Sequence, residues 1–357
     1  MPDYFEIDFL DVESSKSGDA IAIRYEIQGE TNIHVVDGGY VDTGNSLKEH
    51  INKYYNHPKI IDRVVVTHPD GDHANGLRTI LEDFTVSELW MLRPWLYAEE
   101  LLPRFSRFQS VDNLKKRLRE IYSSISALEE IAIRKKIKIM EPFQGNKIGA
   151  FHVLAPSKTR YLDLIVESEK TPEAVAEEKQ IARSISLDSI FSKAISYIKS
   201  AWGVEKFSEE DTSSENEMSV VQFANLCNTK ILLTGDVGRI GLMEAADFSS
   251  EVGLILPGID RFQVPHHGSR RNVSTEVLDR WLGGKTSQKG EAKFTAIVSS
   301  AKEDKDHPRK AVLRAMIHRG AKVITTEGRT ISVFQNAPKR DGWGPIEGEP
   351  YPEDQED

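Results

Sequence analysis

The sequence predicts a soluble α/β protein in which two β-sheets pack face to face and helices cover both outer faces. Short segments alternate apolar and polar residues with a period of two, which is typical of strands with one buried face. Segments with a helical period follow these strands, and the pattern occurs both before and after a central helical region. Packing the sheets together with helices outside buries the apolar faces of all these elements.

The first half is expected to open as an antiparallel meander. Residues 4–12 and 20–27 alternate with period two, and the SSKSGD between them is a turn signal. Residues 32–40 read as a third strand that ends in a tight Asp37-Gly38-Gly39 turn. The elements expected next are a helix at 45–55, a strand at 60–67, a helix at 75–84 and a strand at 87–92.

The second half repeats the alternation of strands and helices. Strands are expected at 218–226, 230–236, 261–269, 293–300, 321–326 and 329–334. Helices are expected at 239–246, 273–282 and 309–320, the last with Gly320 as its C-cap.

Two long helical stretches interrupt this rhythm, at about 111–136 and 172–201. We therefore expect a single domain over residues 1–336 with helical insertions at about 104–136 and 170–202. The last eleven residues, EGEPYPEDQED, hold six acidic residues and no basic one. Residues 337–357 are accordingly predicted to be an acidic, disordered tail.

Composition limits the partners. The formal net charge of −10 argues against a wholly basic protein that wraps nucleic acid. Residues 104–138, however, carry ten basic and four acidic residues, so this basic helical segment either contacts nucleic-acid phosphates or is a solvated helix face.

No apolar run approaches the roughly 18–20 residues that span a bilayer, and the acidic N-terminus is unlike a signal peptide, so no membrane contact is expected. The single cysteine, Cys227, excludes a disulfide framework and favours a cytoplasmic setting.

The residues most informative about function follow the strand at 60–67, in the sequence VVVTHPDGDHANGL. His68, Asp70, Asp72 and His73 form an H-x-D-x-D-H box, and Gly71 gives the backbone the freedom to wrap these side chains around an ion. Imidazole and carboxylate together suit a first-row divalent metal. A surface Asp-Gly turn with incidental histidines is the alternative.

Three other strand-to-helix junctions carry similar side chains. Asp236 is the last residue of the strand expected at 230–236. The adjacent His266 and His267 lie near the end of the strand expected at 261–269, and His307 precedes the helix at 309–320. Adjacent histidines point in different directions, so one of the pair is expected to be a metal ligand and the other to contact substrate. Because sites in layered α/β folds form at strand ends, these junctions predict one shared metal site.

The order D-G-G, H-P-D-G-D-H, G-D, H-H-G-S and a late H-P resembles the metallo-β-lactamase fold. More narrowly, it resembles the soluble hydrolase domain of ComEC-like competence proteins, with Gly18-Asp19-Ala20 matching what remains of their first box. The resemblance covers roughly residues 4–100, 137–156 and 216–335. It implies an αββα sandwich that holds one or two divalent metal ions, zinc or manganese.

The resemblance also implies roles for individual residues. His68 and Asp70 would hold one metal, Asp72 and His73 the other, and Asp236 would bridge both. His266 or His267 would complete the second site; we assign His267 as the ligand and Asp72, His266 and His307 as the residues that act on water, substrate or leaving group. Two departures favour Mn²⁺ or Mg²⁺ over Zn²⁺. Asp70 stands where a histidine is usual. A histidine is also expected after the hairpin predicted at 138–157, and none is evident, since His152 lies on the wrong part of its strand.

Three functions fit these observations. The first is a metal-dependent phosphodiesterase or nuclease that acts on a nucleic acid or nucleotide with a metal-activated hydroxide, which the basic segment at 104–138 favours. The second is hydrolysis of a lactone, ester or thioester, since fold does not choose among substrates. The third is a non-catalytic module whose helical insertions bind another protein.

Overall fold

Two seven-stranded sheets face each other in the computed structural model, which describes residues 3–12, 14–171 and 196–357. Sheet A has the order β15-β1-β2-β3-β4-β5-β6 and sheet B the order β14-β13-β12-β11-β10-β8-β7. The strands of sheet A are β1 (Tyr4–Phe9), β2 (Ala20–Ile27), β3 (Glu30–Gly38), β4 (Ile60–Val65), β5 (Thr85–Trp90), β6 (Lys138–Met140) and β15 (Ile331–Gln335). Those of sheet B are β7 (Lys147–Ile148), β8 (Phe151–Ala155), β10 (Val221–Leu226), β11 (Thr229–Leu233), β12 (Arg261–Gln263), β13 (Phe294–Val298) and β14 (Ala321–Thr325).

Alternation along the strands explains the packing. Phe5, Ile7 and Phe9 of β1 point inward and share one core with residues of sheet B such as Ile231 and Ile297. The intervening residues of sheet B, such as Phe262, point to the opposite face and share a second core with the helices that cover it. Each strand of sheet B therefore contributes to both of its faces.

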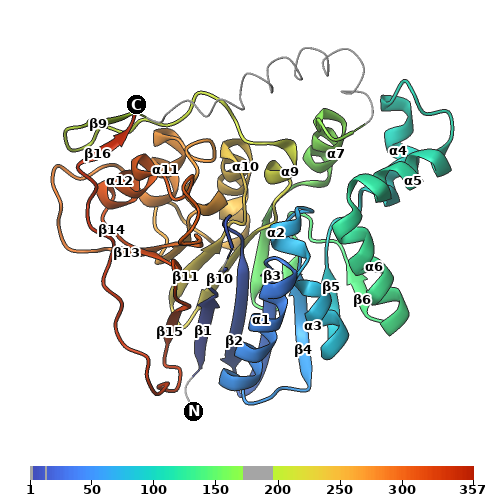
Figure 1. Ribbon diagram of the computed structural model, residues 1–357, viewed down its shortest axis with the longest axis horizontal. Coiled ribbons are helices and arrows are strands. Elements are labelled where there is room, and N and C mark those ends of the chain that lie inside the picture. Colours follow the sequence, from blue (N-terminus) through green and yellow to red (C-terminus); the bar gives the residue numbers. More distant parts are fainter. Residues whose placement is uncertain (1–2, 13, 172–195) are drawn as a thin grey trace.

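Helices cover both outer faces (Figure 1). The helices α1 (Val41–Tyr54) and α3 (Leu77–Asp83) pack on sheet A, whereas α10 (Arg239–Phe248), α11 (Thr275–Leu282) and α12 (Lys310–His318) pack on sheet B. This αββα sandwich confirms the predicted fold class, and the antiparallel pairing of β1, β2 and β3 confirms the predicted meander. The other α-helices of the described residues are α2 (Gly71–Ala74), α4 (Ala98–Leu101), α5 (Val111–Ile121), α6 (Ser123–Lys135), α7 (Lys158–Glu167) and α9 (Ser214–Glu217).

Parallel pairing brings the functional loops to one edge. Strands β3, β4, β5 and β6 of sheet A are parallel, as are β11, β12, β13 and β14 of sheet B. The segments that follow β3, β4, β11, β12 and β13 therefore leave the sandwich at the carboxyl ends of parallel strands, where layered α/β folds place their ligands.

The two predicted helical insertions differ from expectation. The stretch at 111–136 is two helices, α5 and α6, which separate at Tyr122, whose ring is buried. Residues 172–195 of the second predicted helix lie outside the described residues. Its last part is wrong, because Tyr197–Lys199 is strand β9, which pairs with β16 (Asp354–Glu356).

The prediction of a disordered tail at 337–357 is also wrong. Strand β16 ends the chain in a small two-stranded sheet, and Gln355 and Glu356 are buried. Arg340 pairs with the buried carboxylates of Glu6 and Asp8 at 2.7 and 2.8 Å. The acidic segment therefore packs against basic groups and backbone donors far away in the sequence. None of the helices in the described parts of the chain is long and apolar enough to cross a membrane.

Candidate metal centre

Three buried histidines each have their Nδ1 atom held by an acceptor. His73 Nδ1 lies 2.8 Å from Asp37 Oδ2, and His267 Nδ1 lies 2.9 Å from the carbonyl oxygen of Ser299. Because a carboxylate and a carbonyl only accept, both Nδ1 atoms must carry the proton. His68 Nδ1 lies 3.1 Å from the hydroxyl of Thr67, which donates its own hydrogen to Asp37 and so accepts from the imidazole. In their neutral forms all three rings thus expose an unprotonated Nε2, the state that binds a metal.

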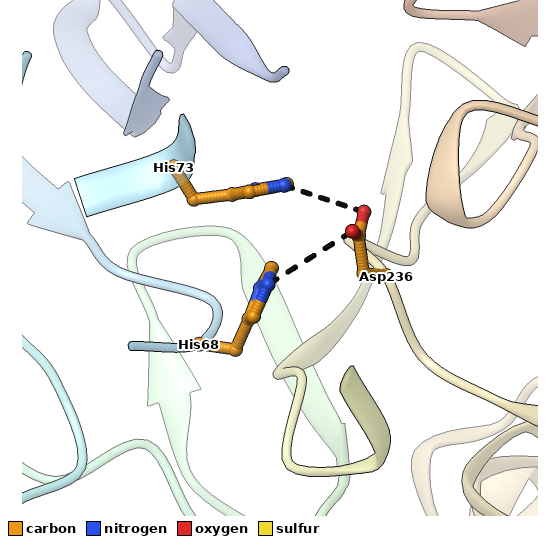
Figure 2. A group of neighbouring side chains, drawn as sticks. All are labelled: His68, His73 and Asp236. Atoms are coloured by element: carbon orange, nitrogen blue, oxygen red, sulfur yellow. Dashed lines mark ion pairs between the residues drawn. The ribbon is translucent and has the colours of Figure 1, made fainter. Parts of the chain in front are cut away.

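These Nε2 atoms are buried and converge on one carboxylate. Figure 2 shows His68 and His73 both directed at Asp236, with His73 Nε2 3.4 Å from Oδ1 and His68 Nε2 3.9 Å from Oδ2. His267 Nε2 lies 3.7 Å from Asp236 Oδ2. Among the described residues, none of the three Nε2 atoms and neither Asp236 Oδ1 nor Asp19 Oδ1 has a hydrogen-bond partner. A tetrahedral ion with ligands at about 2.1 Å holds them about 3.4 Å apart, so the spacing fits a metal ion.

Charge supports the same fit. Burial alone would lower the pKa of His73, but Asp236, Asp37 and Asp72 outweigh it and raise this pKa well above its usual value. Burial would likewise raise the pKa of Asp236, yet His73, His267 and His266 hold it well below its ordinary range. The centre therefore requires positive charge between buried carboxylates and imidazoles. A divalent cation bound by the free Nε2 lone pairs meets that requirement.

The donors form overlapping groups that allow more than one ion. His68, His73 and Asp236 form one group, and Asp72, His73 and His267 form another. A third group joins Asp19 to Asp236 and His267. Asp72 is the most open of these donors, with 28% of its side chain exposed, and its Oδ2 atom lies 4.0 Å from His267 Nε2.

Asp70 is not among the gathered donors of the described residues. Its Oδ1 atom binds Lys170 Nζ at 2.7 Å, and its Oδ2 atom is 4.0 Å from His68 Nε2. Burial would raise the pKa of Asp70, but His68 and Lys170 lower it, so the carboxylate is ionised beside a lysine. The predicted role of Asp70 as a ligand thus stays a prediction, and its observed partner is a cation from the second insertion.

The two adjacent histidines are placed differently, as expected. His267 is buried within two of the donor groups, whereas 24% of the His266 side chain is exposed. His266 stacks on His307 with ring centroids 5.5 Å apart, and its Nδ1 donates to Asn272 Oδ1, 2.9 Å away. The geometry favours His267 as the ligand and places His266 and His307 together at the mouth of the centre. Burial, followed by the charges of His267 and His266, lowers the pKa of His307 to about 4.

Glycines allow the loops of the two sheets to meet. Gly235, with φ of +50°, precedes Asp236, and a Cβ atom there would lie 2.9 Å from Thr67 Oγ1. A Cβ atom on Gly76 would lie 1.9 Å from the carbonyl oxygen of Gly38. Side chains at these two positions would separate the turn that carries His68 and His73 from its neighbours.

Two acidic residues at the centre were not predicted as functional. Asp37 orients His73 and also accepts from Thr67 N at 2.8 Å, while Asp19 contacts the donor groups and is held by Gln263 Nε2 at 2.9 Å. Both lay inside motifs already quoted, Asp37-Gly38-Gly39 and Gly18-Asp19-Ala20. The available signal was an aspartate at the end of an otherwise apolar strand. Ser219, whose hydroxyl accepts from Asp236 N at 3.2 Å, had no such signal.

The sequence pattern of this region matches a known family model over about a third of the chain. The sequence model of the metallo-beta-lactamase superfamily matches residues 18–137, which include Asp19, Asp37 and the whole H-x-D-x-D-H box. The chain has the metallo-β-lactamase fold. A search of curated proteins finds no match. The narrower resemblance to ComEC-like proteins stays a prediction.

Solved structures with similar folds differ in activity. Zn²⁺-bound PqqB from Methylobacterium extorquens is 11% identical with a TM-score of 0.44, covering 91% of this chain and 99% of that one. A diphosphatase of the PhnP family is 9% identical with a TM-score of 0.39, covering 93% and 98%. The hydrolase AbOPH is 11% identical with a TM-score of 0.31; the matched part is 61% of this chain and 56% of that one. Similarity of this degree does not specify a substrate for this metallo-β-lactamase-fold protein.

Proposed function

We propose that this protein is a metal-dependent hydrolase of phosphodiesters, acting on a nucleic acid or nucleotide with one or two bound Zn²⁺ or Mn²⁺ ions. The observation that carries the proposal is the convergence of three buried Nε2 atoms, none with a hydrogen-bond partner among the described residues, on the buried carboxylate of Asp236. His68, His73, Asp236, His267 and Asp72 would hold the metal, with Asp19 beside them. When bound, a divalent ion makes water more acidic and withdraws charge from a phosphoryl oxygen.

The protein's own groups suit an anionic substrate. Lys170 stands beside Asp70 at the centre, and its ammonium group can bind a non-bridging phosphoryl oxygen. The amide of Asn216 lies 3.2 Å from His266 Nδ1 at the same mouth and donates to Thr212 Oγ1 at 2.7 Å, which adds polar groups there. These polar donors, rather than an apolar wall, favour a phosphodiester over a lactone or thioester.

Proton transfer is assigned to the most open groups. Asp72 is partly exposed, so its carboxylate can accept a proton from water that enters the centre. His307 Nδ1 lies 3.3 Å from the carboxylate of Asp304. Burial would raise the pKa of Asp304, but hydrogen bonds donated by Asp306 and Ser17 lower it to about 2. Since this ionised carboxylate only accepts, Nδ1 donates and neutral His307 accepts at Nε2. His307 can therefore take up a proton and return it to the leaving oxygen as the imidazolium.

The role of the basic segment at 104–138 in nucleic-acid binding is a narrower part of the proposal. Several of its charges are already paired, including Arg119 with Glu129 and Arg134 with Glu82. Lys115 and Lys116 on α5 are exposed and have no ion pair within the described residues, so they are the groups available to phosphates. Trp90 and Trp95, which a partner-binding module would expose, are buried in the core instead.

The activity test uses purified protein loaded with Zn²⁺ or Mn²⁺. Bis-p-nitrophenyl phosphate and single- and double-stranded DNA are compared with a lactone and a thioester. Turnover of phosphodiesters is expected, with a loss of at least about 100-fold in kcat for Asp72→Ala and none for the matched control Asp42→Ala, an exposed residue of α1. Turnover of carbonyl substrates alone, or equal activity in Asp72→Ala, would contradict the proposal.

A second test concerns the exposed lysines of α5. Lys115→Glu with Lys116→Glu should raise KM for DNA and reduce the slope of log KM against log salt by about one unit per lost phosphate contact. The same charge change at the exposed Lys59 and Lys289 is the control. An unaltered salt slope would remove α5 from the substrate-binding surface without affecting the catalytic assignment.

A further inference from the structure

A second cavity lies at the end of the sandwich opposite the metal centre. Its volume is about 780 Å³, and it is lined by sheet B, by edge strand β15 and by residues 338–346 of the C-terminal segment. Figure 1 shows this segment leaving the foot of β15 and running beside the sheets toward β16. The volume falls in the range of small-molecule sites.

A row of polar residues forms one wall. Arg261, Thr295 and Lys322 are register partners on β12, β13 and β14, so their side chains stand next to one another on the same face. That face is the inner one, since Phe262, Ala296 and Val323 beside them in sequence point to the helix-covered side. The row lies at the start of strands whose other ends lead to the metal centre. The cavity is therefore separate from that centre.

Two cations in this row make no ion pair within the described residues. Burial lowers the pKa of Arg261, and the neighbouring charge of Asp260 offsets this only in part. Arg261 is half-buried, and the one hydrogen bond it makes within the described residues runs from Nη1 to the carbonyl oxygen of Asp260 at 2.9 Å. Lys322 is half-buried and has neither a hydrogen bond nor an ion pair in the described part of the chain. Two acidic residues line the wall: Glu6 is already paired with Arg24 and Arg340, and Asp341 on the C-terminal segment is exposed to solvent. Because half-buried charges are costly without partners, an anion that enters the cavity gains two unpaired cations.

Apolar side chains form another part of the lining and are already in position. Ile324 and Val333 face the cavity from the sheets, and Trp343 and Ile346 face it from the C-terminal segment. The ion pairs of Arg340 hold this segment, and the Trp343 ring packs edge-on against Tyr54 with centroids 5.3 Å apart. A ligand therefore meets a formed wall rather than having to order a free loop.

We propose that this cavity binds a small organic anion in which a flat apolar body carries a negatively charged oxygen group. Arg261 and Lys322 would bind the carboxylate, sulfonate or phosphate oxygens. Trp343, Ile346, Ile324 and Val333 would contact the apolar body. The site is independent of the metal centre and of the proposed hydrolysis.

The test compares two fluorescent probes that share one ring system. 8-Anilinonaphthalene-1-sulfonate carries the negative charge, and N-phenyl-1-naphthylamine lacks it. The sulfonate should bind the native, metal-loaded protein at one site per chain, at least tenfold more tightly than the neutral probe. Removal of metal with a chelator should leave this binding unchanged, which separates the cavity from the metal centre.

Substitutions then locate the site. Lys322→Gln and Arg261→Gln should each weaken sulfonate binding about tenfold, the effect of losing one charge-assisted contact, without changing binding of the neutral probe. Lys302→Gln, an exposed lysine beyond the other end of β13, is the control with the same charge change. Because Arg261 and Lys322 make no ion pair within the part of the chain that the structure describes, their substitution should not lower the unfolding temperature. Equal binding of both probes, or sulfonate binding that both substitutions leave unchanged, would overturn the proposal.

Discussion

Replacement of Asp37 by asparagine tests how the imidazole of His73 is fixed. Asp37 is fully buried and accepts from Thr67 N, Thr67 Oγ1 and His73 Nδ1 at 2.8, 2.6 and 2.8 Å. Asparagine keeps the shape, and its carbonyl can still accept from Thr67 N. Its amide NH₂ group would then face the protonated Nδ1 of His73, placing two donors together. His73 can relieve this by moving its proton to Nε2, the atom that faces Asp236, and such a ring no longer binds metal.

The expected magnitude follows from the loss of the hydrogen bond between His73 Nδ1 and Asp37. A hydrogen bond to a charged group contributes about 1.5–3 kcal/mol, so metal affinity should fall about 10- to 100-fold. Competition for Zn²⁺ with a chromogenic chelator measures this change. Asp62→Asn is the matched control, since Asp62 accepts from the Ile33 amide at 2.8 Å on β4, away from the donor groups. Wild-type Zn²⁺ affinity in Asp37→Asn, with only a loss of stability, would refute the reasoning.

Three further predictions concern stability. Gly76→Ala should lower the free energy of unfolding by about 1–3 kcal/mol in denaturant titrations and weaken metal binding, because the new Cβ atom would clash with the Gly38 carbonyl oxygen. Gly284→Ala, where a Cβ atom would meet open space, should change neither quantity. Deletion of residues 337–357 should destabilise the fold by at least about 3 kcal/mol, since it leaves Glu6 and Asp8 without Arg340; an unchanged melting temperature would show that the segment is dispensable. Burial would raise the pKa of Glu205, but His318 and Arg319 lower it to about 2, so the folded state binds this proton more weakly than the unfolded state. The stability that this group contributes, about 3 kcal/mol, is present above about pH 4.5 and is lost as the pH falls toward 2. In Glu205→Gln, the free energy of unfolding measured with urea should therefore depend less on pH between these values.

Local patterns were sufficient for the sandwich and for the position of the centre. The period-two alternation in β1, β2 and β3 depends on local backbone conformation and on which face of each strand is buried. The ligand-type residues that follow buried strands depend on the same local properties, and both patterns can be read directly from the sequence. The same patterns placed His68, His73, Asp236 and His267 at strand ends, and the structure brings those four side chains together.

Features that depend on partners far away in the sequence could not be predicted from local patterns. The composition of the C-terminal segment is that of a disordered tail, but Arg340 binds Glu6 and Asp8 more than 300 positions away and β16 pairs with β9. The break at Tyr122 depends on how α5 and α6 pack. Asp70 matches a ligand position in its motif, yet its partner is Lys170, one hundred residues further along. Each of these outcomes is decided by a contact that the neighbouring sequence does not contain.

The central claim is that three imidazoles and Asp236 share a divalent ion, and elemental analysis tests it most directly. Protein refilled with Zn²⁺ or Mn²⁺ and freed of excess ion should retain one or two ions per chain by inductively coupled plasma mass spectrometry. His73→Gln and Asp236→Asn should lose most of that metal, whereas His152→Gln, on the far part of β8, should keep it. A wild-type protein that retains no ion, or variants at His73 and Asp236 that retain as much as wild type, would contradict the account.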